Sequence, residues 1–124
     1  MGARLLDALR QTPFTRPEDV VLAFAGLFRR LIVESGTDAG CAVAAVASSA
    51  AGSAPAEAAA AVFTAWEEEL TASLTRAGLP PSRSSAAALV TVAVVEGALV
   101  LARAHRDVQP FDIAIYQLLL LMAT

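Results

Sequence analysis

The chain has 124 residues, of which 56% are hydrophobic and 17% charged, so its length and composition indicate one folded domain and exclude a disordered chain. Its formal net charge of −3, with basic residues scattered along the sequence, argues against a surface that binds nucleic acid directly. The single cysteine excludes an intrachain disulfide, and the first residues lack the continuous apolar stretch of a signal peptide, so we expect a cytoplasmic protein.

Apolar residues at spacings of three and four predict an all-α fold with five or six helices and no strand. The capping sequence from Thr15 to Glu18 starts the second helix, which stops at Gly36. A segment rich in small and polar residues, 48–55, predicts a loop, and Gly78 closes the long helix that follows it. The predicted helices cover residues 3–11, 15–34, 40–47, 55–77, 82–106 and 111–123.

The stretch 86–104 is apolar on every face of a helix except for Glu96 and Arg103, so it should be buried on every side. Its uninterrupted apolar run, 86–95, is too short to span a bilayer, which favours burial inside protein and no membrane partner. Small residues recur on one side of this helix and would let another helix approach closely. Because one small chain rarely covers such a helix, we expect a second copy of the chain across that side.

The last predicted helix is also apolar on more than one side, and a short turn makes it the antiparallel neighbour of the helix before it. Two such hairpins from two chains would form an intermolecular four-helix bundle. We therefore expect a homodimer. The predicted interface residues are Val90, Ala93, Gly97, Leu101, Ala104, Ile115, Leu118, Leu119 and Met122.

Aromatic residues on two helices fall on the faces that should point inward. Phe24 and Phe28 would face Phe63, Trp66 and Leu70 across the interior. The simplest interpretation is an aromatic core, and the alternative is a cavity for a small lipophilic effector, since bundle interiors commonly hold such pockets. The sequence leaves both open.

Two polar residues extend this candidate ligand site. Cys41 lies between apolar neighbours and fits a small buried hydrophobe better than a redox thiol. Glu96, a carboxylate among apolar residues, must be paired, protonated or at a wet edge. It could contact a ligand, a neighbouring helix or an arginine across the interface. The candidate ligand-binding residues are Phe24, Phe28, Cys41, Phe63, Trp66, Leu70 and Glu96.

The sequence contains no residue pattern that is typical of a catalytic or metal-binding site. His105 is the only histidine, near a helix end where a surface role that complements the helix dipole is the simpler reading. Glu67, Glu68 and Glu69 point in three directions about a helix and are expected to form a solvated face. No serine lies beside a base that could activate it. We therefore expect that the protein is not an enzyme and that it has no catalytic residues, no cofactor and no metal site.

Three stretches of the sequence together resemble a known family. They are Gly40-Cys41-x-Val43-Ala44; Phe63-x-x-Trp66-x-x-x-Leu70 with Leu74-x-x-Ala77-Gly78; and Val95-Glu96-Gly97-Ala98-Leu99-x-Leu101-Ala102-Arg103-Ala104 with Arg106-Asp107. The combination resembles the C-terminal regulatory domain of TetR-family transcriptional repressors, in the subgroup of the LmrA and YxaF multidrug regulators. The resemblance covers roughly residues 3–123.

This resemblance implies a single effector-binding and dimerisation domain over residues 1–124. It implies a homodimer formed through the last two helices, a pocket for a small lipophilic effector, and DNA binding only through an N-terminal helix-turn-helix domain that this chain lacks. Ala42 departs from the family pattern, in which proline commonly follows the cysteine. A cavity-free helical homodimer that acts only as an interaction module is the alternative. A small membrane-associated protein is a third reading, which rests on hydrophobicity alone.

Overall fold

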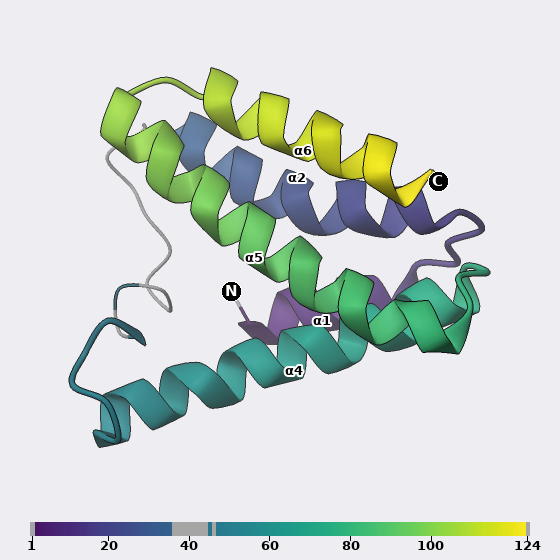
Figure 1. The fold of residues 1–124 in the computed structure, drawn as a ribbon, viewed down its shortest axis with the longest axis horizontal. Coiled ribbons are helices and arrows are strands. Elements are labelled where there is room, and N and C mark those ends of the chain that lie inside the picture. Colours follow the sequence, from purple (N-terminus) through teal and green to yellow (C-terminus); the bar gives the residue numbers. More distant parts are fainter. Residues whose placement is uncertain (1, 36–44, 46, 124) are drawn as a thin grey trace.

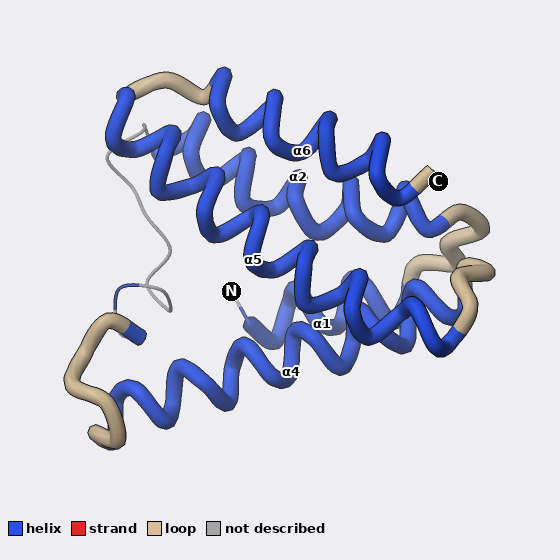
Figure 2. The backbone as a smooth tube through the Cα atoms, in the orientation of Figure 1, coloured by secondary structure: helices blue, strands red, loops and turns tan. Residues whose placement is uncertain are grey.

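The computed structural model describes residues 2–35, 45 and 47–123. The described residues form five α-helices and no strand, and residues 45 and 47 are helical as well, so the predicted all-α class is confirmed (Figures 1 and 2). The predicted helix over residues 40–47 falls almost entirely outside the described residues. The helices are α1 (Gly2–Gln11), α2 (Pro17–Ser35), α4 (Ala54–Arg76), α5 (Pro81–His105) and α6 (Gln109–Met122).

Local sequence signals account for where the helices begin and end. Glu18 and Asp19 lie in the first turn of α2, where carboxylates interact favourably with the helix dipole. Ser53 caps α4, because its side-chain oxygen accepts a hydrogen bond from the Ala56 backbone N–H at 3.3 Å. Gly78, at φ +111°, ends α4 in a conformation that glycine adopts without strain. The predicted ends of all five helices agree with these bounds within about two residues.

The helices form two layers that meet at one end (Figure 1). α4 and α5 are antiparallel neighbours joined by a tight turn, and they diverge away from that turn. α6 turns back along α5 and also packs on α2, while α1 packs on α4 and α2. The hydroxyl oxygens of Thr75 and Ser84 lie 2.9 Å apart beside the turn and fix the α4–α5 register there.

A single apolar core fills the space between the helices. α2 supplies fully buried residues along one stripe, and α4 and α5 supply the opposing surfaces. Every helix contributes at least two members, so each helix is held by tertiary packing. The largest fully buried apolar side chains are Trp66, Phe24, Phe28, Phe111, Leu5, Leu9, Leu70, Leu74, Val20, Val21 and Val95.

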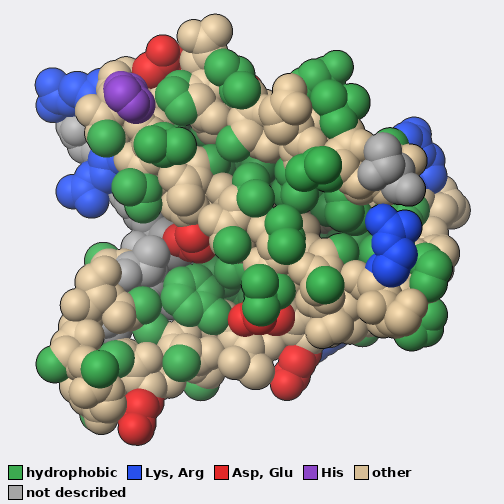
Figure 3. Space-filling view, in the orientation of Figure 1, with side chains coloured by type: hydrophobic (Ala, Val, Ile, Leu, Met, Phe, Trp, Pro, Cys, Tyr) green, Lys and Arg blue, Asp and Glu red, His purple; other side chains and the backbone are tan. Residues whose placement is uncertain are grey.

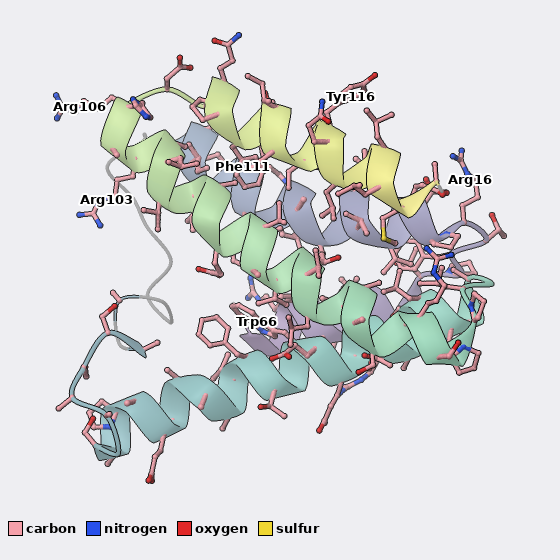
Figure 4. All side chains as sticks on the ribbon, viewed as in Figure 1. Arg16, Trp66, Arg103, Arg106, Phe111 and Tyr116 are labelled. Atoms are coloured by element: carbon pink, nitrogen blue, oxygen red, sulfur yellow. The ribbon has the colours of Figure 1, made fainter. Side chains whose placement is uncertain are left out.

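The inward face of α6 differs from the sequence expectation. Ile115, Leu118 and Met122 were expected at an intermolecular interface, but they are buried in the core of the subunit. They face inward because α6 lies across both α2 and α5, and this contact uses its most continuous apolar stripe. Tyr116 is 60% exposed, and Figure 4 shows it on the opposite side of α6 from Phe111, which points inward.

The three consecutive glutamates of α4 also differ from the expected solvated face. The three side chains point in different directions about the helix, and their burial differs accordingly. Glu68 is exposed and Glu67 is partly buried. Glu69 is buried, with 9% of its surface exposed. Its carboxylate lies 3.1 Å from Arg10 on α1 and 3.2 Å from Arg76, so it belongs to the contact between α1 and α4.

α5 is longer than the uninterrupted apolar run 86–95, which was judged too short to span a bilayer. With 25 residues and a most apolar window of mean hydropathy 2.1, it is long and apolar enough to span a bilayer by length and composition. A core helix of a soluble protein passes the same test, and 39% of this window is already buried within the subunit. Length alone therefore does not decide how α5 is covered.

Candidate functional site

Four aromatic rings from α2 and α4 form one cluster, which we call the aromatic cluster. Phe24 and Phe28 lie one turn apart on α2, with ring centroids 5.1 Å apart. Trp66 meets them edge-on from α4, at centroid distances of 5.9 Å and 5.5 Å. Phe63, one turn earlier on α4, meets Trp66 edge-on at 5.6 Å. Edge-to-face pairs of this kind stabilise beyond the area that they bury.

Burial divides the aromatic cluster into an inner and an outer part. Phe24, Phe28 and Trp66 are at most 1% exposed. Leu70, one turn beyond Trp66, is fully buried as well. Phe63 is only partly buried, so it is the ring of this cluster that reaches the surface. Phe63 is therefore the ring through which the aromatic cluster meets solvent.

The indole nitrogen of Trp66 is an unusual buried donor. Figure 4 shows Trp66 rising from α4 into the interior of the bundle. Its Nε1 atom is shielded from solvent and has no hydrogen-bond acceptor in the described part of the chain. A buried N–H without an acceptor forfeits about 1–3 kcal/mol relative to its hydrated state. Such groups are rare in native proteins.

Glu96 lies on α5 at the level of Phe63 on α4. Both residues are twelve positions from the Thr75–Ser84 contact beside the turn, which is about 18 Å along each helix. Both carboxylate oxygens of Glu96 are shielded from solvent. Figure 3 shows a hollow where α4 and α5 diverge, with an acidic side chain beside apolar ones. Phe63 and Glu96 thus occupy the same level on the two helices that flank this hollow.

The predicted ligand-binding residues separate into three groups in the structure. Phe24, Phe28, Trp66 and Leu70 are brought together in the core. Phe63 and Glu96 are partly buried on the two diverging helices. Cys41 lies outside the described residues.

An exposed apolar surface runs along α5. The residues predicted there for the interface, Val90, Ala93, Gly97, Leu101 and Ala104, are all exposed in the single subunit. Around them, α5 and α6 expose further large apolar side chains, and we call the whole set the outer α5/α6 face. Leu119 is partly buried beside it. The additional members are Leu89, Val100, Ile113, Tyr116, Leu120 and Leu121.

An ion pair links α2 to α6. Nε and Nη2 of Arg29 lie 2.8 Å and 3.0 Å from the two carboxylate oxygens of Asp112. The hydrogen bonds and the charge of Asp112 raise the pKa of Arg29 above its already high ordinary value. The Arg29 guanidinium therefore stays charged at any physiological pH.

The grooves between helices could not be predicted from the sequence, because residues far apart in the sequence line them. A groove of about 450 Å³ between α1 and α2 is lined by Arg4, Arg30 and Glu34 together with three leucines. A smaller one, about 260 Å³, lies between α2 and α6 beside the Arg29–Asp112 pair. No pattern within a single helix predicts either groove.

Comparison with known proteins shows that the chain is similar to part of a transcriptional regulator. It is 35% identical over 98 residues to an uncharacterized HTH-type transcriptional regulator of Mycobacterium tuberculosis, found in two strains. The match covers 73% of this chain and 50% of the relative, so the chain spans about half the length of the curated relatives it matches. No solved structure matches significantly.

The family assignment follows from a second comparison. A model of the C-terminal domain of LmrA/YxaF-like transcriptional regulators matches residues 17–117. This range runs from the start of α2 into α6, so it includes the aromatic cluster and most of the outer α5/α6 face. The chain belongs to this family of TetR-type C-terminal domains.

Proposed function

We propose that this chain is the effector-sensing and dimerisation domain of a TetR-type transcriptional regulator. In this proposal it acts in the cytoplasm without catalysis or a cofactor. A small lipophilic molecule binds at the aromatic cluster and controls DNA binding by a helix-turn-helix domain outside this chain. The single observation that carries the proposal is the aromatic cluster itself, in which the buried Trp66 meets three other rings and one of them, Phe63, reaches the surface.

The composition of the cluster supports a lipophilic effector. Pockets for small molecules are mostly apolar, with a few polar groups that fix orientation. Here the rings supply the apolar contacts, and the Trp66 Nε1 atom and the Glu96 carboxylate supply shielded polar atoms. Phe63 at the surface gives a route by which a ligand could enter.

The outer α5/α6 face supports dimerisation. Ten large apolar residues are exposed in the described part of the chain, and eight of them lie on α5 and α6. Contiguous apolar surface of this kind marks interaction sites. Ala93 and Gly97 lie on the same face, and their small size would let a helix of a second copy approach closely. Two antiparallel α5–α6 hairpins would then form a four-helix bundle.

Titration of lipophilic cations and aromatic compounds, followed by fluorescence, tests the effector site. Trp66 is the only tryptophan, so every change in tryptophan emission reports on the aromatic cluster. We expect at least one compound to change the emission saturably and to raise Tm, because a ligand that binds the folded state stabilises it. A broad panel without any such compound would contradict the proposal.

One observation favours a second candidate, a helical interaction module without a ligand. Phe24, Phe28 and Trp66 are so fully buried that the inner part of the cluster behaves as packed core. In that case the outer α5/α6 face would be the functional surface, and the panel would leave both fluorescence and Tm unchanged.

A further inference from the structure

We infer that the effector carries a hydrogen-bond acceptor, such as a ketone or another carbonyl oxygen, that binds the indole N–H of Trp66. The class of ligand is thus an aromatic compound with an exposed acceptor oxygen rather than a pure hydrocarbon. This inference rests on the proposed function, since it specifies the chemistry of the ligand at the same aromatic cluster.

The Trp66 side chain has apolar surroundings. It is 1% exposed, its Nε1 atom is shielded from solvent, and the described residues offer that atom no acceptor. Its three ring neighbours, Phe24, Phe28 and Phe63, are hydrocarbons. An aromatic face is at best a weak acceptor, so these rings do not replace an oxygen.

A buried donor of this kind discriminates between ligands. A ligand that brings an acceptor satisfies the N–H, whereas an isosteric hydrocarbon leaves it unsatisfied in a drier site. Sites built around a buried polar group reject analogues that lack its partner more strongly than they reject changes in apolar size. The N–H of Trp66 would therefore set the orientation of a ligand that the aromatic rings hold without directional preference.

The position of Phe63 gives a ligand an approach to the Trp66 ring. Phe63 meets Trp66 edge-on, with an interplanar angle of 79°, and it is the partly exposed ring of the cluster. An aromatic ligand that displaces Phe63 would lie against the indole, whereas Phe24 and Phe28 are fully buried.

Two matched pairs of probes test the inference. Benzophenone has a carbonyl group where diphenylmethane has a methylene group, and fluorenone and fluorene differ in the same way. Calorimetric titration of the whole chain should give each ketone about tenfold higher affinity than its hydrocarbon partner, the factor expected for one buried hydrogen bond. In a proton–nitrogen correlation spectrum, the single indole N–H resonance should move downfield with the ketones and exchange more slowly with water.

Trp66→Phe is the matched variant, because it removes the N–H but keeps an aromatic ring. The preference for ketone over hydrocarbon should disappear in it. Equal affinities within each pair for the unaltered chain, with no downfield shift of the indole resonance, would overturn the inference but leave a lipophilic site intact. If none of the four probes binds, the proposed effector site itself is contradicted, and the inference fails with it. The readout from the unaltered chain does not depend on how well the variant folds.

Discussion

Arg10 of α1 and Glu69 of α4 form an ion pair with one well-shielded partner: Nε of Arg10 lies 3.1 Å from Oε2 of Glu69. The Glu69 side chain is 10% exposed, whereas that of Arg10 is 56% exposed. Ser73 and Arg76 lie 3.2 Å from the other carboxylate oxygen. Because α1 precedes the range that the family model matches, this pair joins the matched domain to the segment before it.

Replacing Glu69 should loosen this junction. Glu69→Gln keeps the shape but removes the charge that three donors share, so the free energy of unfolding should fall by about 1–2 kcal/mol. Urea denaturation followed by circular dichroism measures the loss. Glu68→Gln, at the exposed neighbouring position, is the control and should stay within about 0.5 kcal/mol of the unaltered protein. Equal stability of the two variants would show that the Glu69 contacts contribute nothing.

The Arg29–Asp112 pair should behave differently, because both side chains are nearly half exposed, at 47% and 44%. Asp112→Asn should lower Tm slightly at low salt, and the difference should vanish near 1 M salt, where charges are screened over a few ångströms. The raised pKa of Arg29 predicts no pH dependence from its titration between pH 6 and 9. A raised folded pKa gives stability that is lost only as pH rises through that pKa, which lies far above this range. A Tm difference that survives high salt would contradict this account.

The chain alone should not bind duplex DNA with sequence specificity. Its net charge is −3, and it spans half the length of its helix-turn-helix relatives. Anisotropy titrations with labelled duplexes at moderate salt should show no saturable, sequence-dependent signal. Such a signal would mean that the described helices contain a nucleic-acid surface that neither charge nor pattern reveals.

The helices and much of the core could be predicted from the sequence, because spacing and end signals act locally. Phe24, Phe28 and Trp66 were expected to meet, and they do, since each lies on the apolar stripe of a long helix. The orientation of α6 could not be predicted, because that helix is apolar on more than one side and either side could have packed against the core. Ile115 is buried in the core, whereas Tyr116 is exposed. Which side of α6 is buried depends on its packing against α2 and α5.

The burial of polar groups at contacts between helices also could not be predicted from the sequence. Glu69 was expected to be solvated because it is the last of three consecutive glutamates, whereas its contact with Arg10 lies on another helix and is not visible in the local sequence. The lack of an acceptor for the shielded Nε1 atom of Trp66 could not be predicted either, because it depends on which residues surround the indole in the folded chain. Such residues depend on contacts between distant segments, which periodicity within one helix does not encode.

Sedimentation equilibrium of the unaltered chain and its Gly97→Arg variant tests the central claim of a dimeric sensing domain most directly. Gly97 is exposed, and a Cβ added there would meet nothing within 4 Å in the single subunit, so the substitution should leave the subunit fold intact. At a dimer interface the same arginine would bury an unpaired charge at a cost of several kcal/mol, about 3–5. We predict a dimer for the unaltered chain and for the control Glu68→Arg, and a monomer for Gly97→Arg. A monomeric unaltered chain, or a Gly97→Arg dimer of unchanged affinity, would contradict the account.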